Sequence, residues 1–61
     1  MRTYTLELLA SARDRLILAG ESIEEATIDP QVGGSGRIGY LIDAIEEATS
    51  EAEILLSLSA Y

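Results

Sequence analysis

The chain contains neither cysteine nor histidine, and in a protein of 61 residues this absence limits how a fold can be held together. A chain of this length buries only about 60% of the surface that its unfolded form exposes, so a lone core gives marginal stability. Small domains are usually reinforced by disulfides, a structural metal or association. Disulfides are impossible here, and the usual zinc ligands are missing. We therefore expect very efficient packing or self-association.

The balance of charge excludes several classes of partner. Eleven Asp and Glu residues stand against four Arg residues, which gives a net charge of −7 and repels phosphate backbones. The apolar fraction of 48% is that of a globular domain and is too high for a disordered acidic tail. No apolar run approaches the roughly 20 residues of a membrane span, and Glu7 and Arg13 interrupt any signal-peptide core. We expect one small cytoplasmic domain over residues 1–61, with no direct nucleic acid or membrane partner.

Residues 29–36 divide the chain into two halves of similar length. Pro30 disfavours helix at Asp29, and three glycines follow within six residues. We interpret this segment as a flexible Gly-rich loop. The run Gly33-Gly34-Ser35-Gly36 also has the composition of engineered flexible linkers, so a natural turn and an engineered junction both remain open.

The second half has the clearest helical periodicity. Heptad positions a, d and e are nearly all apolar or small, and they are Ile38, Leu41, Ile42, Ile45, Ala48, Thr49, Ala52, Leu55, Leu56 and Ser59. Such a pattern is typical of a helix that faces a core, and it predicts a helix over residues 37–58. Ser50 followed by Glu53 resembles a capping box, at which this helix could break and restart.

The first half is less regular but also predicts helix, over residues 5–27. Apolar residues recur at helical spacing at Leu8, Leu9, Ala12, Leu16, Ala19 and Ile23. Thr5 is a candidate N-cap and Gly20 a candidate stop, while Ser22 with Glu25 could open a further short helix. Our preferred fold is an all-α helical hairpin of two main helices, the first with an optional break at Gly20, completed by oligomerisation.

A small α+β fold remains open as the alternative. Residues 3–8 and 54–59 both alternate between apolar and polar side chains, as strands do. In this arrangement the two terminal strands would pair with each other against a central helix.

Motifs for chemistry are weak in this chain. The segment Gly34-Ser35-Gly36-Arg37-Ile38-Gly39 matches the dinucleotide fingerprint, but that motif needs a preceding strand and a βαβ unit that 61 residues cannot build. A loop without chemistry is the better interpretation, and an anion held at a helix N-terminus beside Arg37 is the lesser one. No His or Lys is present to activate a serine or tyrosine nucleophile. We predict no catalytic residue and no enzyme activity.

Paired glutamates could suggest a metal site, at Glu24 with Glu25 and at Glu46 with Glu47. Helical bundles that bind two metals combine inward glutamates with histidines, and histidine is missing here. A solvated helix face is therefore the better interpretation. We predict neither a metal nor a cofactor.

Two surfaces of the second helix remain as candidate binding sites. The first is an acidic face for a basic protein partner, made of Asp43, Glu46, Glu47, Glu51 and Glu53. The second is an oligomer interface, made of Ile54, Leu55, Leu56 and Leu58. These four residues are apolar around more of the helix than one partner helix can cover, which predicts a homo-oligomer.

These surfaces lead to two functional hypotheses. The first is a non-enzymatic protein-interaction module, an inhibitor or adaptor that docks on a basic, nucleic-acid-binding surface of another protein. Small acidic inhibitor proteins of phages act in this way as a class, and this chain is similar to them in size and charge only. The alternative is a self-associating structural or designed helical oligomerisation module.

Overall fold

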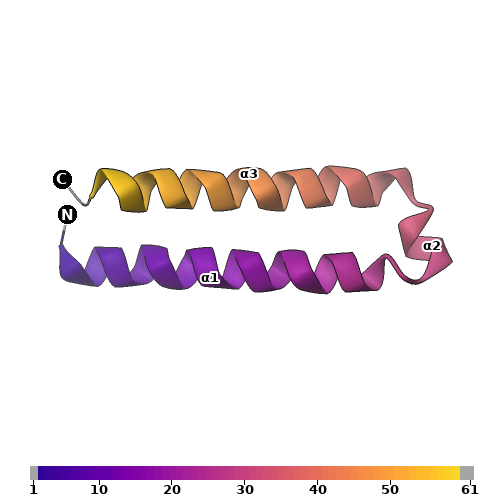
Figure 1. Cartoon of the computed structure of the whole chain (residues 1–61), viewed down its shortest axis with the longest axis horizontal. Helices are drawn as coiled ribbons and strands as arrows, with labels where there is room; N and C mark the ends of the chain where they lie inside the picture. Colours follow the sequence, from indigo (N-terminus) through magenta and orange to yellow (C-terminus); the bar gives the residue numbers. More distant parts are fainter. Residues whose placement is uncertain (1, 60–61) are drawn as a thin grey trace.

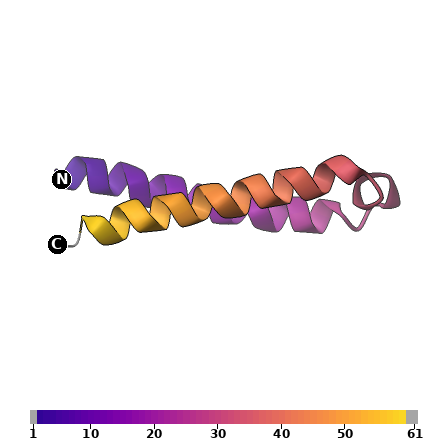
Figure 2. The same ribbon diagram turned by 90° about the horizontal axis from the view of Figure 1, so that it is seen from above.

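The computed structural model describes residues 2–59 and shows an all-α hairpin. Helix α1 spans Thr3–Ala26, the short helix α2 spans Pro30–Gly33, and helix α3 spans Gly36–Leu58. Helices α1 and α3 lie side by side and run in opposite directions, with both termini at one end and α2 at the other (Figures 1 and 2). The predicted helical hairpin is therefore confirmed.

The α+β alternative is wrong for the described residues, which contain no strand. Its two strand-like windows lie at the ends of long helices, residues 3–8 in α1 and 54–58 in α3. A helix continues through these windows because Leu6, Leu9 and Leu56 extend the helical contact between α1 and α3, where each is half-buried.

Helix α1 has no break at Gly20, so that option is also wrong. A Cβ at Gly20 would lie 3.4 Å from the Cγ2 atom of Ile45, which places this glycine against α3. The missing side chain lets the two helices approach closely, and this packing offsets the low helix propensity of glycine. Thr5 is not the N-cap either, because α1 begins after Arg2 without a side-chain cap. Helix α3 likewise continues without interruption past Ser50.

The connection between the long helices is built from caps. The Oδ1 atom of Asp29 accepts a hydrogen bond from the backbone N–H of Gln31 at 2.9 Å, and Pro30 occupies the first position of α2. The Oγ atom of Ser35 accepts from the backbone N–H of Arg37 at 3.3 Å and caps α3. The segment that we interpreted as a Gly-rich loop thus contains one ordered helical turn.

The contact between α1 and α3 follows a regular spacing of three and four residues, as in an antiparallel coiled coil. We call this contact the seam. On α1 and its C-cap it contains Leu6, Leu9, Arg13, Leu16, Gly20, Ile23 and Thr27, and on α3 and its C-cap Ile38, Ile42, Ile45, Thr49, Ala52, Leu56 and Ser59. Among residues 2–59 only Ala52 is buried, at 8% exposed, and the other seam residues are half-buried.

The seam uses only part of the heptad stripe that the sequence predicts for α3. The a and e positions line it, whereas the d positions Leu41 and Leu55 are exposed. On α1, Leu8 and Ala12 of the predicted stripe are also exposed. Apolar side chains are therefore left uncovered beside the seam.

The hairpin is elongated and open on both broad sides. Its Cα extents are 44 × 14 × 11 Å and its radius of gyration is 14.2 Å. A compact domain of 61 residues would have a radius of gyration of about 10 Å. Two helices form a single layer, so within residues 2–59 no further segment covers either broad side.

Candidate interaction surfaces

One broad side of the hairpin is lined with leucine and alanine. In an antiparallel pair, the positions that flank the seam on one side of each helix lie on a common face. Apart from Thr5, they are on this side Ala12, Ala19 and Ala26 of α1 with Leu41, Ala48 and Leu55 of α3, and the apolar residues Leu8, Ala44 and Leu58 lie next to them further out. We call these nine residues the leucine–alanine side. Seven of them are exposed, and Ala19 and Ala48 are half-buried.

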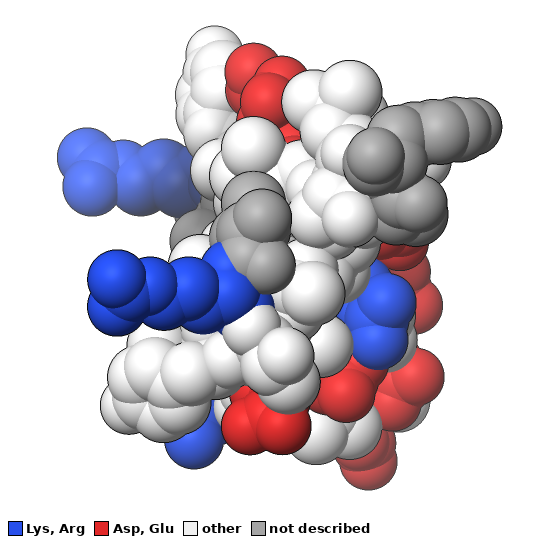
Figure 3. Space-filling model, turned by 90° about the vertical axis from the view of Figure 1, so that its left-hand side faces the viewer, with Lys and Arg blue, Asp and Glu red and all other residues white. Residues whose placement is uncertain are grey.

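The opposite broad side carries most of the acids. The helical period places on it Glu7, Asp14, Glu21 and Glu24 of α1 with Asp43, Glu46 and Glu53 of α3. These seven exposed residues, which we call the acidic side, are seven of the eleven carboxylates in the chain. Figure 3 looks along the hairpin from the end with the termini and shows red atoms at its right and lower sides and a further group at the top, with most blue atoms at the left.

The acidic residues predicted from the sequence do not all share this side. All five are exposed. Asp43, Glu46 and Glu53 lie on the acidic side, Glu47 points outward from the back of α3, and Glu51 lies on the leucine–alanine side. The structure thus groups three of the five.

Sequence reasoning missed the contribution of α1 to the acidic side. Glu7, Asp14 and Glu21 recur at intervals of seven residues, and Glu24 lies one turn beyond them. That spacing is a visible signal for one shared face. Its position beside the acids of α3 follows only from the antiparallel pairing of the two helices.

The arginines are placed away from most of the acids. Arg13 occupies the seam with its side chain 34% exposed, and its Nη2 and Nε atoms donate to the Oδ1 atom of Asp14 at 3.0 and 3.1 Å. Such an exposed pair contributes roughly 0–1 kcal/mol. Arg15 and Arg37 fall on the leucine–alanine side together with Glu51. The acidic side therefore keeps a strongly negative field, whereas the leucine–alanine side is close to neutral.

The predicted oligomer interface is also divided by the fold. Leu56 is half-buried in the seam against α1, while Ile54, Leu55 and Leu58 are exposed. Leu55 and Leu58 belong to the leucine–alanine side, and Ile54 points outward from the back of α3. An interface at this end of the molecule would thus use two of the four predicted residues.

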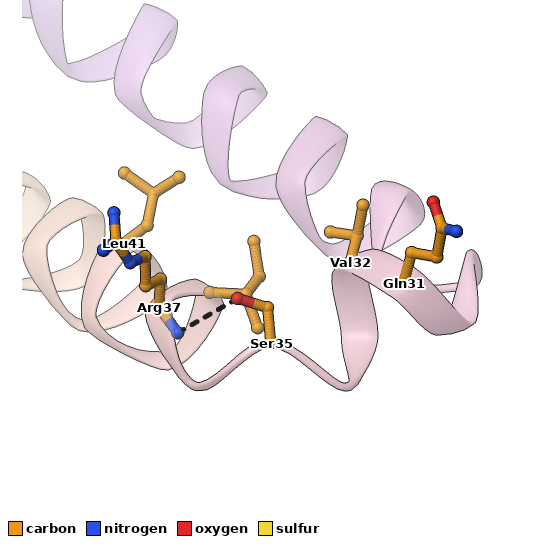
Figure 4. Close-up of a pocket in the computed structure, with 6 residues that line it drawn as sticks. Gln31, Val32, Ser35, Arg37 and Leu41 are labelled. Atoms are coloured by element: carbon orange, nitrogen blue, oxygen red, sulfur yellow. Dashed lines mark hydrogen bonds between the residues drawn. The ribbon is translucent and has the colours of Figure 1, made fainter.

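A shallow hollow of about 270 Å³ lies between α2 and the first turns of α3 (Figure 4). It is lined by Gln31, Val32, Ser35, Arg37, Ile38 and Leu41. The backbone N–H of Arg37 already donates to Ser35, so an anion at the start of α3 would compete with this cap. The residues before Gly34 form a helical turn, where a dinucleotide site would need a strand. The hollow offers no recognisable chemistry.

Other kinds of site find no support in the part of the chain that the structure describes. Residues 2–59 contain no group of three or more acidic side chains placed to hold a metal ion. None of their helices is both long enough and apolar enough to cross a membrane. Comparison of the chain with models of protein families, with curated proteins and with solved structures gives no match. Surface geometry and charge are therefore the features from which a function can be inferred.

Proposed function

We propose that this protein is a non-enzymatic protein-interaction module, an inhibitor or adaptor whose acidic side docks on a basic, nucleic-acid-binding surface of another protein. One observation carries the proposal: carboxylates from both long helices lie on one broad side of the hairpin, while Arg15 and Arg37 lie on the other. A one-sided distribution of this kind gives the molecule a strong field in one direction. A basic protein would be steered toward the acidic side.

The spacing of the acids supports recognition by charge. Glu7, Asp14 and Glu21 lie along α1 at one-heptad intervals, and Glu46 and Glu53 lie along α3 in the same way. Two-turn spacing gives two parallel rows of carboxylates with about 10 Å between neighbours in a row. A partner with clustered Lys and Arg would meet these rows and relieve their mutual repulsion, so association would be fast and sensitive to salt.

The test compares two double variants with the same net charge. Glu46→Lys with Glu53→Lys reverses two charges on the acidic side, whereas Glu25→Lys with Glu47→Lys reverses two exposed charges at the backs of the helices. Partners are first captured from cell extract on the wild-type protein at low ionic strength, then purified, and association rates are measured by stopped flow. The acidic-side variant should lower the association rate at least about tenfold, mostly without changing dissociation.

The control variant distinguishes binding at the acidic side from attraction by the net charge of the whole protein. The variant at Glu25 and Glu47 should bind within about threefold of the wild-type protein, since its reversed charges lie outside the site. Equal weakening by both variants would mean that net charge alone drives binding. A partner whose affinity ignores salt and both variants would contradict the proposal.

The second candidate function is a self-associating structural or oligomerisation module. It is favoured by the scarcity of burial, because Ala52 is the single buried residue between positions 2 and 59. Exposed apolar side chains such as Leu55 and Leu58 are consistent with association with partners. We propose that the protein is a homo-oligomer under either function, since self-association and docking would use opposite sides of the hairpin.

A further inference from the structure

We propose that a second copy of this chain covers the leucine–alanine side, with a two-fold axis parallel to the long axis of the hairpin, to give a four-helix bundle with both connections at the same end. This inference rests on the self-association in the proposed function, and it names the face and the orientation. The sequence predicts an interface made of Ile54, Leu55, Leu56 and Leu58. The interface proposed here keeps Leu55 and Leu58 of that cluster and runs along both long helices.

The exposed area of the hairpin matches what a dimer would bury. A compact folded monomer of this mass, 6.6 kDa, exposes about 3,900 Å². This chain exposes 4808 Å². The excess of roughly 900 Å² is close to the ~800 Å² that each partner buries in a standard interface. The broad side is also large enough, since the Cα atoms alone span 44 × 14 Å.

Charge selects the face that a second copy can approach. Two chains that each carry −7 repel one another, and apposition of their acidic sides would add to this repulsion. The leucine–alanine side has a single acid, Glu51, against Arg15 and Arg37. It is the broad side on which two copies can meet without uncompensated negative charge.

The orientation follows from the register of the two helices. The contact between Gly20 and Ile45 sets this register and brings Ala12 to about the same level as Leu55, and Ala26 to that of Leu41. With the two-fold axis along the hairpin, α1 of the copy lies over α3. Each leucine of α3 then meets an alanine of the copy, so large residues face small ones.

The same axis pairs the central charges. Arg15 and Glu51 lie at nearly the same level on α1 and α3, close to the middle of the hairpin. Rotation about the long axis places Arg15 of each copy opposite Glu51 of the other, which gives two symmetric ion pairs. A two-fold axis across the helices would instead bring Arg15 against its own counterpart. Charge complementarity therefore favours the first orientation.

The face is tested by measuring mass with matched leucine variants. Sedimentation equilibrium of the wild-type protein at micromolar concentration should give twice the mass of the 6.6 kDa chain. Leu55→Asp should raise the dimer dissociation constant about 100-fold or more, because it places a charge in the interface. Leu18→Asp is the control, because Leu18 is also exposed, at 61% against 44% for Leu55, but lies at the back of α1. It should change the constant less than about threefold.

The possible outcomes show whether self-association fails altogether or whether only the proposed interface is wrong. A monomeric wild-type protein would overturn both this inference and the homo-oligomer of the proposed function. An oligomer that Leu18→Asp dissociates and Leu55→Asp does not would overturn the face alone. Circular dichroism of each variant establishes whether it still folds.

A charge exchange tests the contact between Arg15 and Glu51 of the copy even if Leu55→Asp fails to fold, and in it the weakening of the homodimers is the result that depends on the orientation. Arg15→Glu and Glu51→Arg should each weaken homodimers about tenfold, since both symmetric pairs become repulsive. A mixture of the two variants restores two attractive pairs and should form heterodimers in preference to either homodimer, as native mass spectrometry would resolve. A mixture with only a statistical share of heterodimers would overturn the proposed pairing.

Spin labels give an independent measure of orientation. The chain has no cysteine, so Gln31→Cys provides a single labelling site at the connection end. Connections at the same end should give a label separation of about 20–30 Å, two to three helix diameters. Connections at opposite ends would put the labels at least the 44 Å length of the hairpin apart, and that result would refute the orientation.

Discussion

Two exposed glycines near the connection should respond to alanine with changes in stability of opposite sign. Gly33 ends α2 and Gly39 lies in the first turns of α3. Neither has a positive φ, so both positions accept an L-residue backbone. The difference lies in the space available. A Cβ at Gly33 would overlap the backbone carbonyl oxygen of Thr27, whereas a Cβ at Gly39 would meet no heavy atom within 4 Å.

The expected magnitudes follow from these two environments. Gly39→Ala gains helix propensity at no steric cost and should stabilise the hairpin by about 0.5–1 kcal/mol. Gly33→Ala should destabilise it by about 1–2 kcal/mol, because the contact with Thr27 involves backbone and can be relieved only by moving the connection. The variants should differ by about 2 kcal/mol, or about 8–16 °C in Tm for a domain of this size.

Thermal unfolding followed by far-UV circular dichroism measures this difference. Wild-type protein and both variants must be compared at one concentration, because self-association makes Tm depend on concentration. Gly36→Ala is a further control, since a Cβ at Gly36 also has open space around it. A Gly33→Ala variant as stable as the wild-type protein would refute the tight connection. A destabilised Gly39→Ala variant would refute the argument that a Cβ at Gly39 has open space around it.

Two further predictions concern charge. Arg13→Leu should stabilise the hairpin by about 1 kcal/mol in urea unfolding, because an apolar side chain would fill a seam position, while the lost exposed pair with Asp14 contributes less. Higher salt should weaken docking on a basic partner but strengthen dimerisation, because it screens an attraction in the first case and the repulsion between two chains of −7 in the second. Titration calorimetry of partner binding and of dimer dissociation, each at two ionic strengths, measures whether salt changes the two affinities in opposite directions.

The two long helices were predictable from the spacing of apolar residues and from the helix-breaking residues between them. Predicted ranges of 5–27 and 37–58 compare with Thr3–Ala26 and Gly36–Leu58 in the structure. The apolar period is sustained over six turns in each half, and Pro30 with the following glycines interrupts it. The strand-like segments at the termini form helix instead, because each spans only six residues and lies within a much longer helical pattern.

Features that depend on the pairing of the helices were not predictable from local rules. Gly20 reads as a helix stop, yet it lies inside α1 because Ile45 packs against it. A glycine stop is a rule of local propensity, worth about 1 kcal/mol, and tertiary packing can exceed it. Arg13 belongs to the seam for a related reason. Its aliphatic stem can lie in the contact while its charged end reaches solvent and Asp14.

The two flanks of the seam differ more than solubility requires. Both flanks lie at the same distance from the seam, so solvent would act on them equally in an isolated hairpin. One flank carries Glu24, Glu46 and Glu53 besides Ala10, Ile17 and Gly39, whereas the equivalent positions on the other carry alanine and leucine, apart from Thr5 at the start of α1. Since a two-helix layer covers two positions in each heptad, a third apolar position has no role in the hairpin itself. The pattern is that of a helix within a bundle, so we infer that the sequence is adapted to an assembly in which one flank is buried and the other stays free to meet a partner.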